Sequence, residues 1–223
     1  MTNTLFPDQP WMLPLMVAVS FILPRIPVVG KFFNVINTAL HEFGHALMAL
    51  VLDGEVRKID LNNDASGTTT TVLKGKFASF LCALAGYPCA ISVAWLSVYL
   101  LKHGAVQGLV IGLSVLFLLM LVLWIRNLYG VVWVLLFLAL NGCLIYLGNP
   151  LYLRYAAVFY TIMMITESIF SVLVLFYLSV RTPQSAGDAT NLAKLTHVPA
   201  FVWSLLFMGY VAFVTCRIYF MIF

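Results

Sequence analysis

The sequence His41-Glu42-Phe43-Gly44-His45 lies within the apolar run Phe32–Leu52, and it points to both a chemistry and a fold. On a helix, residues four apart share a face, with Cβ atoms about 5–6 Å apart. His41 and His45 can therefore present ring nitrogens to one tetrahedral zinc ion, with Glu42 beside it. A carboxylate there can take a proton from zinc-bound water, whose pKa the metal lowers to about 7, and pass it to a leaving amine. The motif predicts metal-dependent hydrolysis, and the alternative is two histidines satisfied by neighbouring helices.

The composition around this motif is that of a membrane protein. The chain is 63% hydrophobic and 9% charged, whereas about a quarter of the residues of a soluble domain are charged. Polar or proline-containing breaks separate the apolar runs Trp11–Leu23, Phe32–Leu52, Phe77–Leu101, Ala105–Ile125, Leu128–Leu147, Tyr155–Val180 and Ala200–Phe223. We predict an α-helical polytopic membrane protein with about six or seven transmembrane helices, built as one integral-membrane domain over residues 1–223. The net charge of +4 forms no basic block, so nucleic acid is not an expected partner.

One connection differs from the others because it is long and polar. Residues 54–74 contain strand-favouring positions (Val56, Ile59, Leu61 and the run Thr68–Thr71) around the turn-forming sequence Asn62-Asn63-Asp64-Ala65-Ser66-Gly67. We predict a short β-hairpin at the cytoplasmic membrane surface, with an open edge to which an extended peptide can add as a strand. The alternative is a solvated connecting loop.

Basic residues give the orientation of the chain in the membrane. With the hairpin inside, seven Lys and Arg residues fall on the cytoplasmic side and four or five on the other, as the positive-inside rule requires. The N-terminus is then expected inside and the C-terminus outside.

A catalytic zinc site needs a third protein ligand and leaves its fourth position to water. Candidates by residue type are His103, His197, Asp8, Asp53, Asp60, Asp64, Glu167 and Asp188. Asp188 lies in a connection on the same side as the hairpin and precedes a helical pattern, where a carboxylate can turn inward; a simple N-cap also explains it. His103 falls on the opposite side. Glu167, inside an apolar run, is either functional or a polar contact between helices.

These stretches resemble the site-2 protease family of zinc intramembrane metallopeptidases, especially its small bacterial branch. The resemblance rests on His41–Leu47, on Gly54–Ile59 with Ser66–Thr68, and on Gly187–Ala193. Ala85-Gly86-Tyr87-Pro88 and Arg126-Asn127-Leu128-Tyr129-Gly130 also fit it, with packing and turn roles. The resemblance implies zinc bound by His41, His45 and Asp188, with Glu42 as general base. The family's usual L-D-G sequence is replaced here by Gly-Asp-Ala, and the sequence Leu52-Asp53-Gly54 is interpreted as a helix end.

The implied function is a zinc-dependent endopeptidase that cleaves within or near transmembrane segments of membrane proteins, as in regulated intramembrane proteolysis. Its expected surroundings are the lipid bilayer of a bacterial inner membrane, and its partner is a membrane protein or peptide substrate. A non-proteolytic zinc-binding scaffold or chaperone is the alternative, and it would tolerate loss of Glu42. A metal transporter would need more ionisable residues along the apolar runs.

Overall fold

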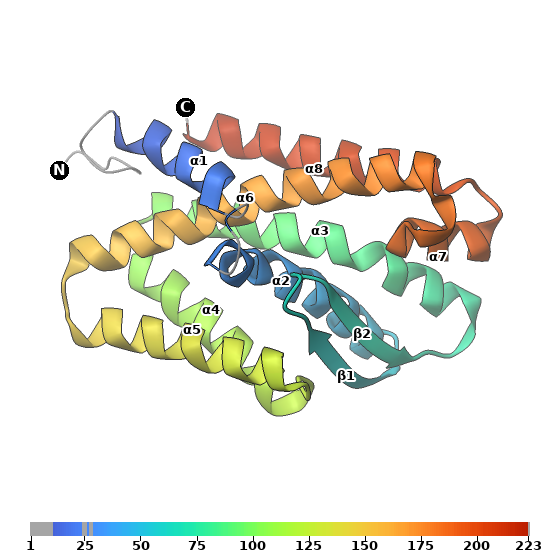
Figure 1. Cartoon of the computed structure of the whole chain (residues 1–223), viewed down its shortest axis with the longest axis horizontal. Coiled ribbons are helices and arrows are strands. Elements are labelled where there is room, and N and C mark those ends of the chain that lie inside the picture. The colour runs from blue at the N-terminus through green and yellow to red at the C-terminus, as the bar shows by residue number, and fades with distance from the viewer. Residues whose placement is uncertain (1–10, 24–25, 27–28, 223) are drawn as a thin grey trace.

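The structure is a computed structural model that describes residues 11–23, 26 and 29–222. It is mainly helical, with one small sheet (Figure 1). The elements in chain order are α1 (Met12–Ile22), α2 (Val29–Val51), β1 (Glu55–Leu61), β2 (Gly67–Val72), α3 (Gly75–Lys102), α4 (Val106–Leu123), α5 (Leu128–Tyr146), α6 (Pro150–Arg181), the 3-10 turn η2 (Pro183–Ser185), α7 (Gly187–Thr196) and α8 (Ala200–Ile222).

The prediction of a polytopic helical membrane protein is confirmed. Five helices, α3, α4, α5, α6 and α8, are long and apolar enough to cross a bilayer. The motif helix α2 has 23 residues but is not among these five, and α1, at 11 residues, is about half the length that a span requires. Each predicted apolar run corresponds to one helix, with ends that differ by at most five residues.

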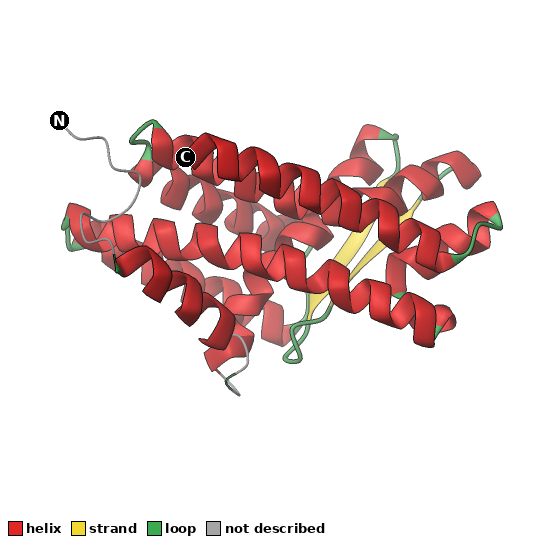
Figure 2. Ribbon diagram, turned by 90° about the horizontal axis from the view of Figure 1, so that it is seen from above, coloured by secondary structure: helices red, strands yellow, loops and turns green. Residues whose placement is uncertain are grey.

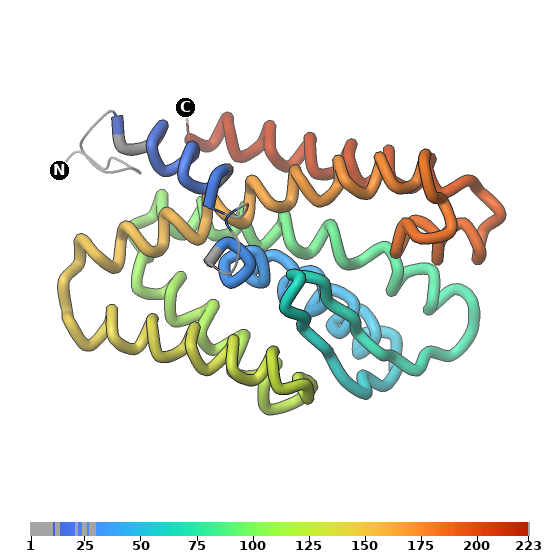
Figure 3. The backbone as a smooth tube through the Cα atoms, in the orientation of Figure 1, coloured from blue at the N-terminus to red at the C-terminus, as the bar shows by residue number. Residues whose placement is uncertain are grey.

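The long helices lie side by side, and different connections lie at the two ends of the bundle. Figure 1 shows α7 and the β2–α3 connection at one end, while the α3–α4 and α5–α6 connections lie at the other. Figure 3 shows α2 crossing obliquely beside α3. Seen from above in Figure 2, the hairpin lies behind the long helices, toward the end that carries α7.

Helix α2 packs closely against α3, and glycine permits this approach. A Cβ at Gly44 would lie 2.6 Å from Cys89 Cβ and 2.8 Å from the Ala85 carbonyl oxygen, so only glycine fits without a shift of the helices. Because Gly44 lies between the two motif histidines, the same packing that builds the core brings α3 against the motif.

The predicted hairpin is present, and the solvated-loop alternative is wrong. Strands β1 and β2 are antiparallel, with Ile59 opposite Thr69 and Leu61 opposite Gly67. The side chains of Ile59 and Leu61 are fully buried in the main hydrophobic core. The hairpin is therefore an integral part of the bundle, held by apolar burial worth about 1.5–3 kcal/mol per side chain.

The helix end predicted at Leu52-Asp53-Gly54 is also observed. Helix α2 ends at Val51, and Asp53 adopts a φ of 52°, in the left-handed region that terminates helices. A Cβ at Gly54 would lie 2.9 Å from the carbonyl oxygens of both Ala49 and Val72. The chain thus turns sharply from the motif helix into β1, which directs the hairpin back along α2.

Candidate metal centre

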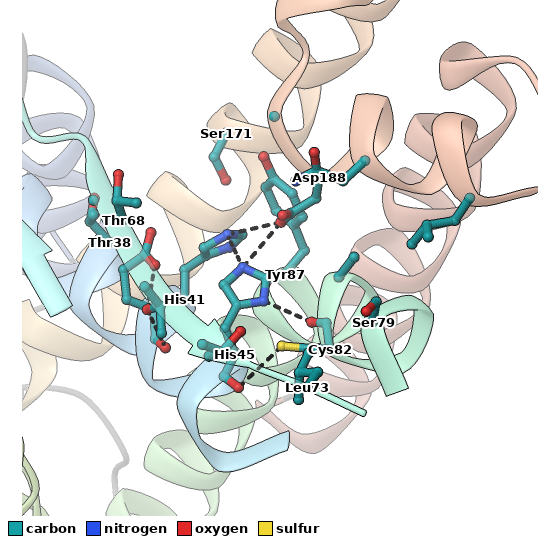
Figure 4. A pocket seen from close by; sticks show the side chains of 18 of the residues that line it. Thr38, His41, His45, Thr68, Leu73, Ser79, Cys82, Tyr87, Ser171 and Asp188 are labelled. Atoms are coloured by element: carbon teal, nitrogen blue, oxygen red, sulfur yellow. Dashed lines mark hydrogen bonds and ion pairs between the residues drawn. The ribbon is translucent and has the colours of Figure 1, made fainter. Parts of the chain in front are cut away.

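Three donor atoms converge at the C-terminal half of α2. His41 Nε2 and His45 Nε2 lie 3.0 Å apart, and Asp188 Oδ2 lies 3.1 Å from the first and 3.2 Å from the second (Figure 4). The histidines come from successive turns of α2, and the aspartate comes from α7. Among the described residues, these form the one group of three or more His, Cys, Asp or Glu side chains with this proximity.

The spacing of these atoms fits a tetrahedral metal ion. Ligands about 2.0–2.2 Å from a zinc ion at tetrahedral angles lie about 3.3–3.6 Å from one another. The observed distances of 3.0–3.2 Å between the donor atoms are a few tenths of an ångström shorter than this. Two imidazole nitrogens and one carboxylate oxygen are also a donor set that zinc accepts. The group can therefore hold a metal ion with small adjustments of the side chains.

The backbone of α3 fixes the orientation of His45. Its Nδ1 donates a hydrogen bond of 2.8 Å to the carbonyl oxygen of Cys82. Because a carbonyl only accepts, Nδ1 carries a proton, and Nε2, which points toward the other two donors, is the nitrogen available to bind a metal ion. A bond to the main chain leaves this orientation insensitive to the side chain at position 82.

The His41 ring lies against Gly86 of α3, where the helix carries no side chain. A Cβ at Gly86 would lie 2.6 Å from Nε2 and 2.7 Å from Nδ1 of His41. The ring also contacts Tyr87 edge-on, with centroids 4.5 Å apart. The sequence Ala85-Gly86-Tyr87-Pro88 thus forms the wall that holds the first histidine.

Asp188 lies in the first turn of α7, but it does not cap that helix. The N-cap position is Ala186, with no side-chain hydrogen bond, and the Asp188 carboxylate contacts the two imidazoles instead. The capping alternative is therefore wrong. Burial opposes ionisation of this carboxyl, but His45 and His41 outweigh that effect and hold its pKa well below the usual range. The ionised carboxylate is the form that binds a cation.

Glu42 faces the hairpin. It is 5% exposed, and its Oε2 accepts a hydrogen bond of 2.6 Å from Thr69 Oγ1 of β2. A Cβ at Gly67 would lie 2.6 Å from Glu42 Cγ and 2.8 Å from Oε1. One turn earlier, Thr38 Oγ1 donates to the Ala65 carbonyl at 2.7 Å. The hairpin therefore lies directly on the face of α2 that carries the carboxylate.

The histidines, Glu42 and Asp188 line a single cleft of about 1010 Å³. Strand β2 forms one wall, with Thr68, Thr69 and Thr71, and helices α3, α6 and α7 form the others. Figure 4 shows the donor atoms inside this cleft, with Thr68 on one side and Asp188 on the other. The cleft thus brings the donor atoms, Glu42 and one strand of the hairpin together.

The other candidate ligands lie elsewhere. Asp8 is outside the described residues, Asp60 pairs with Lys58 at 2.7 Å, and Asp64 accepts from Ser66 in the hairpin turn. His103 follows α3 at the far end of the bundle, His197 and Asp53 lie at helix ends, and Glu167 is buried on α6; none belongs to the group of donors.

Sequence reasoning missed the contacts that hold the site. Cys82 and Thr69 act on residues far along the chain, and nothing in their local pattern indicated it. A signal was present for Gly86 and Gly67, because each is a glycine in or beside a regular element, where close backbone approach is a common cause.

The comparisons with known proteins agree with this geometry. Over residues 12–218, nearly the whole chain, the sequence matches the family model described as Peptidase M50B-like. No curated protein and no solved structure gave a match. Taken with the five candidate spans and the metal-competent donors, this match shows that the chain is a multi-pass membrane protein of a peptidase family. The chain belongs to the site-2 protease family, in its Peptidase M50B-like group.

Proposed function

We propose that this protein is a zinc-dependent intramembrane endopeptidase. It hydrolyses peptide bonds within or near the transmembrane segments of other membrane proteins, in the inner membrane of a bacterium. The observation that carries the proposal is the triangle of His41, His45 and Asp188 donors, with edges of 3.0–3.2 Å, in one cleft with Glu42. In this proposal those three residues hold the zinc ion and Glu42 is the general base.

The bound ion would polarise the scissile carbonyl and lower the pKa of its water. Each side chain then has a defined task. The Cys82 carbonyl and the wall at Gly86 keep the two imidazoles aimed at one point. With Oε2 held by Thr69, Glu42 has its second carboxylate oxygen to accept the proton of the attacking water and return it to the leaving amine.

Strand β2 suits an extended substrate. The sheet has two strands in the described residues, and β2 lines the cleft. A substrate strand that pairs with the free edge of β2 would run past the donor triangle with its main chain exposed. A transmembrane helix must unwind for this, because its peptide bonds are otherwise internally hydrogen-bonded. Strand addition compensates part of that cost with new main-chain hydrogen bonds.

The test measures metal and cleavage separately, in purified protein in detergent micelles. Wild type is expected to contain one zinc per chain by elemental analysis and to cleave fluorescein-labelled β-casein, an unfolded probe that needs no unwinding. Glu42→Gln should keep the zinc and lose cleavage by about 100-fold or more. Asp188→Ala should lose both. Cleavage that persists in Glu42→Gln refutes the proposal, and zinc without cleavage in wild type favours the scaffold alternative.

A further inference from the structure

The turn between α4 and α5 forms hydrogen bonds with the edge of β1 that does not pair with β2. The Ile59 amide donates to the Trp124 carbonyl at 2.9 Å, and Ile59 forms a parallel bridge with Ile125. Two residues further, the Leu61 amide donates to Asn127 Oδ1 at 3.1 Å, and Asn127 Nδ2 donates to the Leu61 carbonyl. The outer edge of β1 is therefore closed by this turn.

Asn127 satisfies both main-chain groups of one residue. A side-chain amide carries the same donor and acceptor as a peptide group, so it can replace a strand residue in a ladder. Neighbouring residues make room for it and shape the turn. A Cβ at Gly130 would lie 2.7 Å from Asn127 Oδ1, and Arg126 donates to the last carbonyls of α4, among them that of Leu123 at 2.6 Å. These contacts account for Arg126, Asn127 and Gly130 in the sequence Arg126-Asn127-Leu128-Tyr129-Gly130.

The two residues of β1 that the turn holds are directly opposite the two residues of β2 that contact Glu42. Ile59 pairs with Thr69, whose hydroxyl donates to the Glu42 carboxylate. Leu61 pairs with Gly67, which packs against the same carboxylate. A continuous ladder thus runs from the α4–α5 turn through both strands to Glu42. Its members come from four separate parts of the chain.

We propose that Asn127 is a positioning residue for Glu42, acting through this ladder. It fixes the height and register of the hairpin over α2, so that the Thr69 hydroxyl meets the carboxylate and Gly67 covers it. Because the turn closes β1, the edge of β2 in the cleft is the edge left for a substrate strand. This inference rests on the proposed function, in which Glu42 is the general base.

The test uses Asn127→Leu, which removes both hydrogen bonds of the Asn127 side-chain amide while keeping a side chain of similar volume. The matched control is Asn149→Leu, which removes an Asn side chain that caps α6 at 2.9 Å from the Leu151 amide, at the other end of the bundle. A lost N-cap costs about 0.5–2 kcal/mol, so the control matches general destabilisation without touching the hairpin. Both variants are studied as full-length protein in detergent micelles.

Two readouts are independent of activity. Amide hydrogen exchange over residues 55–73 should be about tenfold faster in Asn127→Leu than in wild type or the control. Carbodiimide labelling of Glu42, measured by mass spectrometry, should rise by a similar factor, because the carboxylate loses its cover. Zinc content should be unchanged. Exchange or labelling equal to wild type overturns the inference, whatever the enzyme does.

The third readout is cleavage of fluorescein-labelled β-casein. Since a misplacement of about 1 Å in a catalytic group costs about 100-fold, kcat should fall by that order in Asn127→Leu, with KM within about twofold. Thr69→Val should lower kcat to a similar extent, whereas Thr69→Ser should retain most of the activity. The double variant Asn127→Leu/Thr69→Val should be no less active than either single variant. Full kcat in Asn127→Leu overturns the inference. If wild type itself is inactive, the proposed function fails, while exchange and labelling still decide whether Asn127 holds Glu42.

Discussion

Replacing Gly86 with alanine should damage metal binding from outside the set of ligands. The new Cβ would lie 2.6 Å from His41 Nε2, whereas ordinary contact begins at 3.4 Å. The imidazole must therefore retreat by about 1 Å, several times the tolerance of about 0.2 Å on a metal–ligand distance. We expect zinc affinity to fall by at least about 100-fold, which corresponds to about 2.7 kcal/mol.

The assay is competition for zinc between the purified protein and a chelator of known affinity, in detergent. The matched control is Gly209→Ala in α8, because a Cβ at Gly209 has no neighbour within 4 Å. That control should bind zinc as wild type does and be stabilised by up to about 1 kcal/mol, as for other Gly-to-Ala changes in helices. Overpacking by Gly86→Ala should also lower the free energy of unfolding by about 1–3 kcal/mol.

Equal zinc affinities for Gly86→Ala and wild type would refute this reasoning. They would mean either that α3 moves away without disturbing His41, or that His41 does not bind the ion. Thermal unfolding separates these outcomes. A loss of stability with normal zinc affinity indicates helix movement, and normal stability with normal affinity removes His41 from the site.

Three further predictions concern the hairpin and the distant core. Gly67→Ala should abolish β-casein cleavage with zinc retained, because the added Cβ would lie 2.6 Å from Glu42 Cγ; cleavage and metal analysis test this. Asn141→Ala removes the hydrogen-bond acceptor that lies 2.9 Å from the Tyr160 hydroxyl. The free energy of unfolding, measured by thermal melting, should fall by about 1–3 kcal/mol, with cleavage per folded molecule unchanged. In the hairpin turn, hydrogen bonds from the Ser66 hydroxyl and the Ser66 main-chain amide lower the pKa of Asp64. The ionised carboxylate therefore stabilises the turn at neutral pH, and this stabilisation is lost as the pH falls through the lowered pKa. Hydrogen exchange of residues 62–66 should show this pH dependence in wild type but not in Asp64→Asn.

The parts of the fold that local patterns specify could be predicted from the sequence. The spacing of His41 and His45 depends on one helix alone, and hydropathy is a property of each run by itself. The hairpin follows from its turn residues and threonines, and its existence was predicted. Asp188 was chosen by its side of the membrane and by resemblance, and the structure places its carboxylate beside both imidazoles.

What could not be predicted are contacts between elements distant in the sequence. Thr69 meets Glu42 across 27 residues, and Leu61 meets Asn127 across 66. No periodicity specifies which face of a hairpin packs on which helix, because that depends on how all the side chains fill the core. The sequence predicted the hairpin, but it did not show that Ile59 and Leu61 would be buried in the core of the bundle.

The separation of the three donors along the chain has a consequence for biosynthesis. His41 and His45 lie on α2 and are synthesised early, but Asp188 lies on α7, more than a hundred residues later. At about 5–20 residues per second, a ribosome needs roughly 7–30 s to proceed from the histidines to the aspartate. During that interval the nascent chain has two of the donors but not the third, so the three-donor site cannot form. Any function of the three-donor centre therefore begins only after α7 has been made, and a product truncated before α7 carries the motif without the third donor.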